Sequence, residues 1–592
     1  MAGGPDRPGG PLLHISRTFP TNPGTAAAPA ATLSPPGAGP GVRTGGVTVR
    51  FGRAELTSRS GRIVLVVVLL ALVAAGLGIQ RALGDDPAGP AAGGGATGSH
   101  RVVPVPLTTT GGTGAGYTLT VRTAISTVDG NPAARQVAEQ LAAGLRRSTG
   151  LPLPVTGDHG ARDGIDLALD QALPEETGPE GYRLLAGADG IRITARTEEG
   201  LYRGTQTLRQ LLPAQAESRT PVPADWTVAP VGIIDRPRYA YRGAMLDVAR
   251  HFFTVDEVKA YVDRLSLYKF NHLHLHLTDD QGWRLAVPGR PALTGIGAAT
   301  EIGGTPGGFY TEADYREIVR YAQERYLTVV PEIDLPGHTN AVLTAYPELD
   351  CSGGPAAQPY FGNAVGFSLI CPTDERTYAF TGEVIAHLAA LTPGPYLHIG
   401  GDEVKTLAPA GYQEFVRRVA AQVRAAGKIP FGWNQTAPVA GGDGVGLLEF
   451  WSTDGADARA MTAAAGRGAR VVMAPAGRAY LDMKYDSGTA LGVRWAGTVS
   501  VRNAYSWNPD TELELPAGAV AGIEAPLWTE TLPGLAEVDQ MALPRLPALA
   551  EVGWSAQSAR DWDGFRLRLA AQGPRWEAAG FGFARRPEIP WP

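Results

Sequence analysis

The second part of the chain repeats one pattern, a short apolar run followed by a longer segment with helical spacing. Apolar runs that fit strands stand at 243–248, 273–277, 327–333, 396–399, 429–433, 447–451, 471–474 and 521–528. Segments with helical spacing separate several of them, at 255–268, 312–325, 376–391 and 412–426. Such repetition over roughly 340 residues predicts an α/β fold with a (β/α)8 TIM barrel. An open doubly wound sheet fits less well, because no Gly-rich dinucleotide loop follows the first strand.

The residues before this repeat show a different pattern. Strand-like runs at 117–121, 182–185 and 190–194 are interleaved with helical segments at 133–148 and 200–212. We therefore expect a small α+β domain at 102–232 in front of a catalytic barrel at 233–592. The smaller domain holds no cluster of catalytic residue types in its sequence.

An uncharged and mostly apolar run, IVLVVVLLALVAAGLGI, occupies residues 63–79. A membrane-spanning helix needs about 17–25 such residues. Arg residues dominate the charge of the preceding segment, which indicates a cytoplasmic N-terminus. We expect a disordered cytoplasmic tail at 1–62, a single-pass anchor in the cell membrane at 63–80, a flexible linker at 81–101 and an extracellular catalytic domain. The alternative is a cleaved signal peptide, which would release a secreted protein.

Overall charge and cysteine content narrow the class of protein further. The formal net charge is −6 and charged residues make up 19% of the chain, so no basic field indicates a nucleic-acid partner. The two cysteines are Cys351 and Cys371. In an oxidising compartment we expect them to form a disulfide across the long loop after the third strand, whereas in a reducing one they would stay thiols.

Acidic and aromatic side chains gather where the expected strands end. One strand ends in Gly400-Gly401-Asp402-Glu403, with two adjacent carboxylates. Because ionised groups at a buried strand end lose hydration, such a position is usually kept for chemistry, and in a barrel the active site lies there. The other strand ends carry Arg242 and Asp247, Asp279 and Asp280, Asp334 and His338, Trp433, Trp451, Tyr480 and Asp482, and Trp528 and Glu530. Carboxylates accept hydrogen bonds from hydroxyls and rings pack against C–H faces, so this set predicts a sugar-binding pocket.

Five sequence blocks, in the right order, resemble the family 20 glycoside hydrolases, the β-N-acetylhexosaminidases. They are RGAMLDVAR at 242–250, HLHLTDDQGWR at 274–284, EIDLPGH at 332–338, GGDE at 400–403 and EAPLWTE at 524–530. The resemblance covers the chain from about residue 102 to the C-terminus, including the small domain that precedes the barrel in that family. It implies an exo-acting, retaining β-N-acetylhexosaminidase that acts on N-acetylhexosamine-containing oligosaccharides or glycoconjugates and uses no cofactor.

The resemblance also implies that the substrate supplies its own nucleophile. The 2-acetamido oxygen would attack C1 and form an oxazolinium intermediate. Glu403 would protonate the leaving oxygen and later activate water, while Asp402 would orient the acetamido N–H and stabilise positive charge. Tyr480 would donate to the acetamido oxygen. Asp279 and His338 would form a relay behind the acid.

The remaining roles implied by the family concern contact with the sugar. The aromatic wall of the acetamido pocket would be formed by Trp433, Trp451 and Trp528, and Trp495 is a further candidate for contact with the sugar. The ring hydroxyls would be held by Arg242, Asp482 and Glu530, with Asp334 as a sugar-site or supporting group. One position departs from the family pattern, since Gln435 stands where many members have Glu after Gly-Trp-x. This departure affects a supporting contact and leaves the reaction unchanged.

Three alternatives stay open at this point. His272, His274 and His276 share one face of a strand, a spacing that can bind a metal, but the resemblance accounts for them without one and we expect no metal site. A surface protein on the same scaffold could bind sugar without turnover, although intact Asp402 and Glu403 argue against it. A family member could also release a disaccharide, which would need a more open second subsite.

Overall fold

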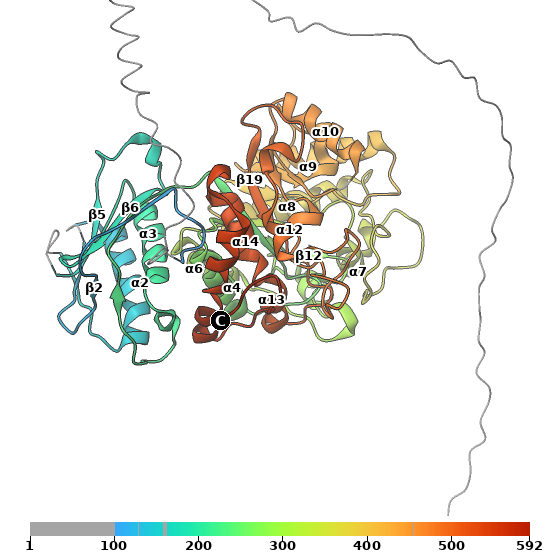
Figure 1. The fold of residues 1–592 in the computed structure, drawn as a ribbon. Coiled ribbons are helices and arrows are strands. Elements are labelled where there is room, and N and C mark those ends of the chain that lie inside the picture. The colour runs from blue at the N-terminus through green and yellow to red at the C-terminus, as the bar shows by residue number, and fades with distance from the viewer. Residues whose placement is uncertain (1–100, 128–129, 158–162, 453) are drawn as a thin grey trace, which may run out of the picture. The chain divides into compact units, whose positions relative to one another are not determined.

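The computed structural model describes residues 101–127, 130–157, 163–452 and 454–592 (Figure 1). Within these ranges no helix has both the length and the apolar character needed to cross a membrane. The expectation of a single-pass membrane protein with an extracellular catalytic domain is therefore corrected. The expected anchor at 63–80, the tail at 1–62 and nearly all of the linker at 81–101 lie outside the described residues.

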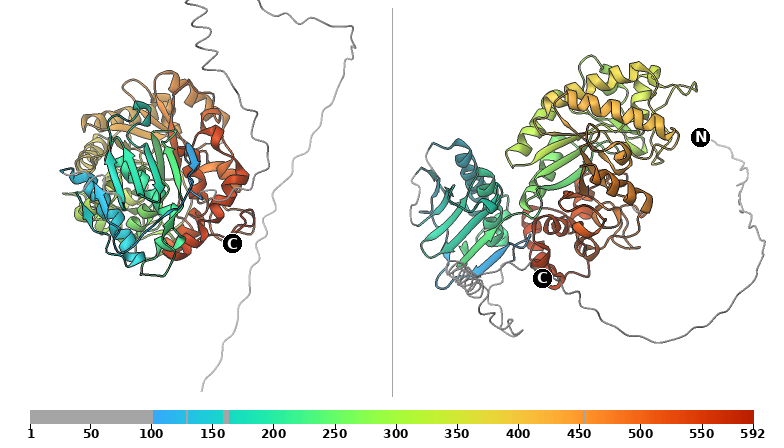
Figure 2. Two further views of the ribbon diagram at one scale, coloured as in Figure 1. Left: turned by 60° about the vertical axis from the view of Figure 1, so that its left-hand side comes forward. Right: turned by 90° about the horizontal axis from the view of Figure 1, so that it is seen from above.

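A seven-stranded sheet forms the first part of the described chain, and the left view of Figure 2 looks onto its strands. Its strands, in spatial order, are β1 (Thr108–Gly111), β9 (Val231–Asp235), β6 (Tyr182–Gly187), β7 (Gly190–Ala195), β5 (Ile165–Leu169), β3 (Ile125–Thr127) and β4 (Val155–Thr156). The predicted hairpin is the antiparallel pair β6–β7. Two helices, α2 (Pro132–Thr149) and α3 (Glu198–Leu211), pack against the sheet through an apolar stripe. A short pair, β2 (Tyr117–Thr118) and β8 (Thr227–Val228), lies apart from the sheet.

Eight parallel strands close a barrel, as the repeated pattern predicted. They are β10 (Tyr241–Asp247), β11 (His272–His276), β14 (Thr328–Glu332), β15 (Tyr396–His398), β16 (Ile429–Trp433), β17 (Leu447–Phe450), β18 (Arg470–Met473) and β19 (Val520–Ala525). A small hairpin, β12 (Thr278–Asp279) with β13 (Gly282–Trp283), follows the second barrel strand. The right view of Figure 2 shows the barrel with its surrounding helices from another side.

The helices that follow the barrel strands are of unequal length. The longer ones are α4 (Val255–Leu267), α6 (Glu312–Gln323), α8 (Glu375–Leu391), α9 (Pro409–Ala425), α10 (Gly455–Gly466) and α14 (Arg545–Trp554). The shorter ones are α5 (Pro291–Gly295), α7 (Asn340–Ala345), α11 (Ala476–Ala479), α12 (Val501–Tyr505), α13 (Leu535–Ala542), α15 (Trp562–Ala570) and α16 (Gly573–Ala579). One unit departs from the ideal repeat: β16 leads to β17 through the 3₁₀-helix η5 (Asn434–Val439).

The side chains of β11 alternate as His-Leu-His-Leu-His, and the leucines and the histidines lie in different environments. Leu273 and Leu275 belong to the large apolar core between the strands and the outer helices. Because successive side chains point to opposite faces, the three histidines point into the barrel. There His274 meets Glu524 from β19, with 2.7 Å between Nδ1 and Oε1. The barrel interior is therefore partly polar, and its charges are compensated between strands.

A buried ionic cluster joins the small domain to the barrel; we call Glu180, Arg203, Asp235, Arg242 and Lys269 the junction. Glu180, just before β6, is paired with Arg203 of α3 and with Arg242 of β10. Lys269 donates from Nζ to Asp235 Oδ2 over 2.8 Å. Burial opposes ionisation, yet the Arg242 and Arg203 guanidiniums lower the pKa of Glu180 to about 2. Glu180 is thus held ionised by its two arginine partners, and it serves as a structural contact between the small domain and the barrel.

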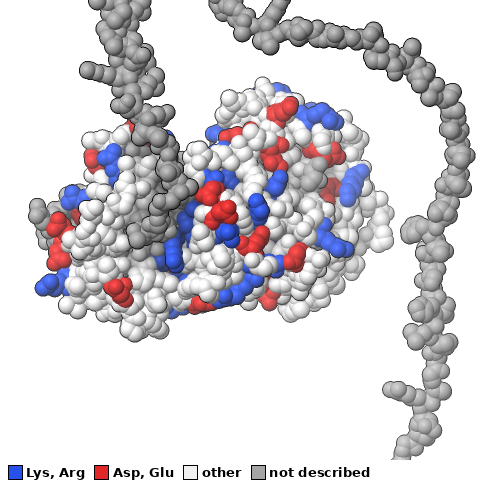
Figure 3. Space-filling view, viewed as in Figure 1, with Lys and Arg blue, Asp and Glu red and all other residues white. Residues whose placement is uncertain are grey.

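Surface charge is of mixed sign. Figure 3 shows Lys and Arg interspersed with Asp and Glu over the visible face. Such mixing fits the modest net charge of −6. It gives no extended field of one sign that would attract a polyanion.

Candidate active site

Two glycines in the left-handed region of the backbone come directly before the acid pair. Gly400 and Gly401 have φ of 64° and 105°. A Cβ on Gly400 would lie 1.7 Å from Asp334 Oδ1, so any side chain there would displace Asp334. Gly401 N donates to the same oxygen over 3.0 Å. The glycine pair therefore folds the end of β15 back onto Asp334 and fixes the residues that follow.

Two residues at this loop hold a strained backbone. Glu403 and His338 both have φ of 54°, in the left-handed region. This conformation costs of the order of 1–3 kcal/mol for a residue with a side chain, and it persists mainly at functional sites. The two strained residues face each other, with 3.5 Å between His338 Nε2 and Glu403 Oε2. The strain thus marks two residues that the family resemblance assigned to the site.

Asp402 and Glu403 have unequal surroundings. The side chain of Asp402 is 11% exposed, whereas that of Glu403 is 27% exposed. Among the described residues no hydrogen-bond partner meets Asp402 Oδ1. The deeper carboxylate thus has free accepting capacity, and the shallower one can reach a group that enters from outside.

A neighbouring carboxyl group controls the charge of this pair. Burial, followed by the charge of Asp402, raises the pKa of Asp334 well above its usual range. A protonated Asp334 can donate to Asp402 while its other oxygen accepts from Gly401 N. Asp334 therefore acts as a neutral support that lets Asp402 carry the negative charge.

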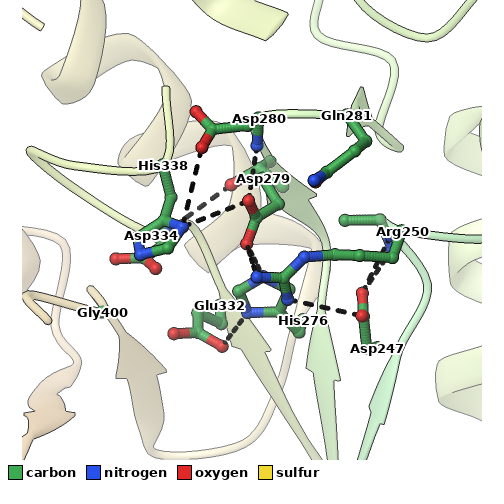
Figure 4. Close-up of polar contacts among 12 residues, drawn as sticks. Asp247, Arg250, His276, Asp279, Asp280, Gln281, Glu332, Asp334, His338 and Gly400 are labelled. Atoms are coloured by element: carbon green, nitrogen blue, oxygen red, sulfur yellow. Dashed lines mark hydrogen bonds and ion pairs between the residues drawn. The ribbon is translucent and has the colours of Figure 1, made fainter. Parts of the chain in front are cut away.

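A chain of charged groups runs from Glu403 into the barrel, and Figure 4 shows its inner part. His338 Nδ1 lies 3.2 Å from Asp279 Oδ1, and the other oxygen of Asp279 lies 2.9 Å from His276 Nε2. His276 Nδ1 then contacts Glu332 Oε2 at 2.5 Å. The relay expected from Asp279 and His338 therefore extends further than the two residues named from the sequence.

Electrostatics keep this chain charged. Burial opposes an imidazolium at His338, but the charges of Asp279 and then Asp402 raise the pKa of His338 well above its usual range. Burial likewise opposes a charged His276, yet Glu332 and Asp279 raise its pKa to about 10. A cationic His338 next to the acid pair can hold Glu403 in place and compensate negative charge as it develops there.

Aromatic rings line one side of the acid pair. Trp433 and Trp528 have ring centroids 5.9 Å apart, and Tyr480 lies 6.4 Å from Trp528. Trp495 packs edge-on against Trp451 at 5.6 Å and against Tyr480 at 5.8 Å. Trp433 is fully buried and donates from Nε1 to Glu332 Oε1 over 2.9 Å. Trp495 is 55% exposed, so it forms the rim of this aromatic wall.

Two acids complete the polar side of the mouth. Asp482 is buried, and within the described part of the chain neither of its carboxylate oxygens meets a donor in hydrogen-bonding geometry. Burial, then the charge of Glu530, raises the pKa of Asp482 well above its usual range. These acids offer acceptors for hydroxyl groups at the edge of the aromatic wall.

Comparison with known proteins identifies the family of this chain. A family model, "Glycosyl hydrolase family 20, catalytic domain", matches residues 239–413 and 407–557, and "Glycosyl hydrolase family 20, domain 2" matches residues 99–235. The chain belongs to glycosyl hydrolase family 20.

Individual relatives match over most of the chain. A β-N-acetylhexosaminidase of Cellulomonas fimi is 44% identical over 493 residues, which is 83% of this chain and 97% of that protein. The solved structure of the family 20 β-N-acetylhexosaminidase from Streptomyces coelicolor A3(2) is 51% identical with a TM-score of 0.80, covering 83% of this chain and 99% of its own. A mutant β-hexosaminidase of Streptomyces plicatus, solved in complex with the product GlcNAc, is equally similar, with 51% identity, a TM-score of 0.80 and coverage of 83% and 98%.

One residue assigned to the sugar site from the sequence lies elsewhere. Arg242 is 1% exposed and its guanidinium binds Glu180, Tyr239 O and Lys269 O in the junction. It stands at the start of β10, whereas the site gathers at the other end of the strands. The assignment of Arg242 to the sugar is therefore corrected, because all of its donors are used at the opposite end of the barrel.

Arg250 is the residue that the sequence reasoning missed. It follows the carboxyl end of β10 and contacts Asp279 Oδ2 at 2.7 Å, with its guanidinium 4.7 Å from the Trp528 ring centroid. Its Nε has no hydrogen-bond partner among the described residues. It ends the same sequence block as Arg242, and the rule that barrel sites lie at carboxyl strand ends would have found it.

The other predicted residues come together at the mouth or beside it. Gln435, the departure from the family pattern, accepts from Trp451 Nε1 at 3.3 Å, so an amide oxygen supports the wall. Cys351 and Cys371 form a disulfide, with Cα atoms 5.1 Å apart.

Donor atoms of His274, Glu332 and His398 lie close enough together to hold an ion. However, Glu332 already pairs with both histidines, at 3.1 and 2.9 Å, so shared protons account for this group.

Proposed function

We propose that this family 20 hydrolase is an exo-acting, retaining β-N-acetylhexosaminidase that releases terminal non-reducing GlcNAc or GalNAc. The coarse activity follows from relatives that carry this name along the whole described chain. The observation that carries the finer proposal is that the two adjacent acids have different surroundings. Asp402 is buried with an accepting oxygen free, while Glu403 is more exposed and contacts a cationic histidine.

In the proposed first step the substrate attacks itself. The acetamido carbonyl oxygen forms a bond to C1 as the bond from C1 to the glycosidic oxygen breaks, and Glu403 gives its proton to that leaving oxygen. Asp402 accepts a hydrogen bond from the acetamido N–H and stabilises the positive charge that spreads over the oxazolinium ring. Tyr480 donates to the acetamido oxygen and so aligns it with C1.

In the second step water replaces the acetamido oxygen. The Glu403 carboxylate takes a proton from water as the water oxygen bonds to C1, and the oxazolinium ring opens to restore the acetamido group. Two displacements at C1 retain the β configuration. Trp433, Trp451 and Trp528 keep other water away from the intermediate, because their rings cover that side of the mouth.

Positioning of the remaining sugar falls to the polar edge of the mouth. We assign the ring hydroxyls to Asp482, Glu530 and Arg250, with Arg250 replacing Arg242 of the sequence prediction. Arg250 is held by Asp279 and Asp247, so its place is fixed before a sugar arrives.

Hydrolysis of 4-nitrophenyl β-GlcNAc and β-GalNAc by the purified full chain tests this proposal. We expect turnover of at least one glycoside, proton NMR to show the β anomer as first product, and a thiazoline mimic of the intermediate to bind far tighter than GlcNAc. Folded protein that binds GlcNAc without turnover would establish the sugar-binding alternative instead. Release of disaccharides rather than single sugars from an oligosaccharide would overturn the exo specificity.

A further inference from the structure

A loop bounded by the Cys351–Cys371 disulfide exposes large apolar rings. Phe361 is 44% and Phe367 is 47% exposed. Tyr360 lies beside them, with its ring centroid 4.6 Å from that of Phe367. We call Tyr360, Phe361 and Phe367 the aromatic loop patch. Single exposed rings are common on proteins, but a cluster of them beside a site indicates a contact surface.

The loop is fastened to the mouth of the barrel by hydrogen bonds within the patch, at Gly362, and directly after it, at Ser368. Ser368 donates from its hydroxyl to Asp280 Oδ1, and Thr339 N donates to Ser368 Oγ over 2.8 Å. Gln281 donates from Nε2 to Gly362 O over 2.8 Å. Figure 4 shows Asp280 and Gln281 directly beside Asp279 of the relay. The second acid of the Asp279-Asp280 pair therefore serves to hold this loop.

The same loop packs against the residue that carries the acid. Gly366 has φ of 75°, and a Cβ on it would lie 2.9 Å from the carbonyl oxygen of Glu403. Phe367 is the next residue, and consecutive Cα atoms are about 3.8 Å apart. The exposed ring of Phe367 thus belongs to the side of the mouth on which Glu403 stands.

That side is where the leaving group must lie. In the proposed function, on which this inference rests, Glu403 protonates the oxygen that joins the terminal sugar to the rest of the substrate. The terminal sugar packs against the aromatic wall around Trp528. The next sugar therefore extends past Glu403 toward the loop. A pyranose offers a face of C–H groups that packs well on an aromatic ring.

We infer that the aromatic loop patch binds the sugar on the reducing side of the scissile bond. The enzyme would therefore favour oligosaccharides whose leaving group is itself a pyranose over glycosides with a small leaving group. Phe367 carries most of this contact. Phe361 also packs over the turn at Gly304, since a Cβ placed on Gly304 would lie 3.7 Å from its ring. The hydroxyl of Tyr360 accepts a hydrogen bond from Ala364 N.

A comparison of two substrates tests this inference in the full chain. Chitobiose has a pyranose leaving group, whereas methyl β-N-acetylglucosaminide has one too small to reach the loop. We expect Phe367→Ala to lower kcat/KM for chitobiose by roughly 3- to 10-fold while the methyl glycoside changes less than about twofold. Phe361→Ala should have a smaller effect of the same kind, and Phe367→Tyr should restore the preference for chitobiose.

The matched control is Leu567→Ala, which removes another exposed apolar side chain, 58% exposed against 47% for Phe367, from α15. It should change neither substrate. An unchanged ratio of the two kcat/KM values in folded Phe367→Ala overturns the inference, and so does an equal loss on both, which would mean that the loop only positions Glu403. Failure of the proposed function is a different result, namely no turnover of either substrate by the unmodified chain.

Discussion

Two parts of this molecule bury charge at opposite ends of the same strands, and they do so in different ways. In the junction every ionised group has partners: Glu180 binds Arg203, Arg242 and Asn271, and Asp235 binds Lys269. At the mouth several buried oxygens and one ring nitrogen have no hydrogen-bond partner among the described residues, on Asp402, Asp482, Asp280 and His338. The groups named in both regions are buried.

The difference separates structural charge from chemical charge. A buried ion that keeps all its partners is compensated and serves to fix one part of the fold against another. A buried acceptor without a partner costs free energy that a bound hydroxyl or amide can recover. The mouth is therefore poised for a ligand rich in hydrogen-bonding groups, and the junction is not.

Replacing the acid should have the largest effect on the mouth. We expect Glu403→Gln to lower kcat by about 10²–10⁴-fold with no change in the free energy of unfolding, because only the transferable proton is lost. Steady-state hydrolysis of a nitrophenyl glycoside and a urea melt measure the two quantities. Glu414→Gln on the exposed face of α9 is the control and should alter neither. Near-normal turnover by Glu403→Gln would remove it from the role of acid.

The two arginines of one sequence block should respond in opposite ways. Arg242→Met leaves Glu180 with fewer cationic partners and should destabilise the fold by about 3–5 kcal/mol without raising KM. Arg250→Met should raise KM and lower kcat/KM while unfolding changes less, since Arg250 stands beside Asp279 and Trp528. Denaturant melts and kinetics on both variants form the test. A raised KM in a folded Arg242→Met variant would restore the assignment that the structure corrects.

Asp402→Asn removes charge from the mouth without changing the shape of the side chain. We expect a loss of about 10²–10³-fold in kcat, because the oxazolinium would no longer have a carboxylate next to it. A thiazoline inhibitor, which carries similar charge, should lose affinity in parallel with kcat. Loss of kcat with unchanged thiazoline affinity would mean that Asp402 does not stabilise the intermediate.

Much of this arrangement could be read from the sequence because it follows local periodicity. The alternation of apolar runs and helical segments predicted the closed barrel, and the strand ends predicted that acids and tryptophans stand at the same end of it. The five blocks of the resemblance led to the family. The short connection through η5 was not predicted, since a 3₁₀ turn leaves no periodic signal.

The errors came from information that a single sequence does not contain. Arg242 was placed at the mouth because its block was treated as one unit, although Arg242 lies at the start of the seven-residue strand β10 and Arg250, eight positions later, lies beyond its end. Its true partner, Glu180, stands 62 residues earlier, and no local pattern links the two. The apolar run at 63–80 led to a membrane assignment that no helix of the described chain supports.

Lowering the pH should remove the contribution that Glu180 makes to the stability of the junction. The pKa of Glu180 is lowered to about 2 from an ordinary value of 4.5. A carboxyl group whose pKa is lowered in the folded protein stabilises the fold at any pH above its ordinary pKa. This stabilisation is lost as the pH falls from 4.5 toward 2. The difference in unfolding free energy between the unmodified chain and Glu180→Gln should therefore shrink by about 3 kcal/mol across that window. A difference that stays constant with pH would mean that Glu180 is not ionised in the folded protein.

The contribution of Asp334 to stability should depend on pH with the opposite sign, and its replacement by Asn should have the smallest effect on activity. Its raised pKa means that the folded protein holds the protonated form, so its contribution to stability is full at low pH and is lost as pH rises through the folded pKa. Asn copies a protonated Asp, with one acceptor for Gly401 N and one donor toward Asp402. We expect Asp334→Asn to keep kcat/KM within about tenfold, whereas Asp334→Ala, which leaves Gly401 N without an acceptor, should lose more. Equal losses in the two variants would show that the mouth needs an ionised Asp334, and the contrast in sign between mouth and junction would then fail.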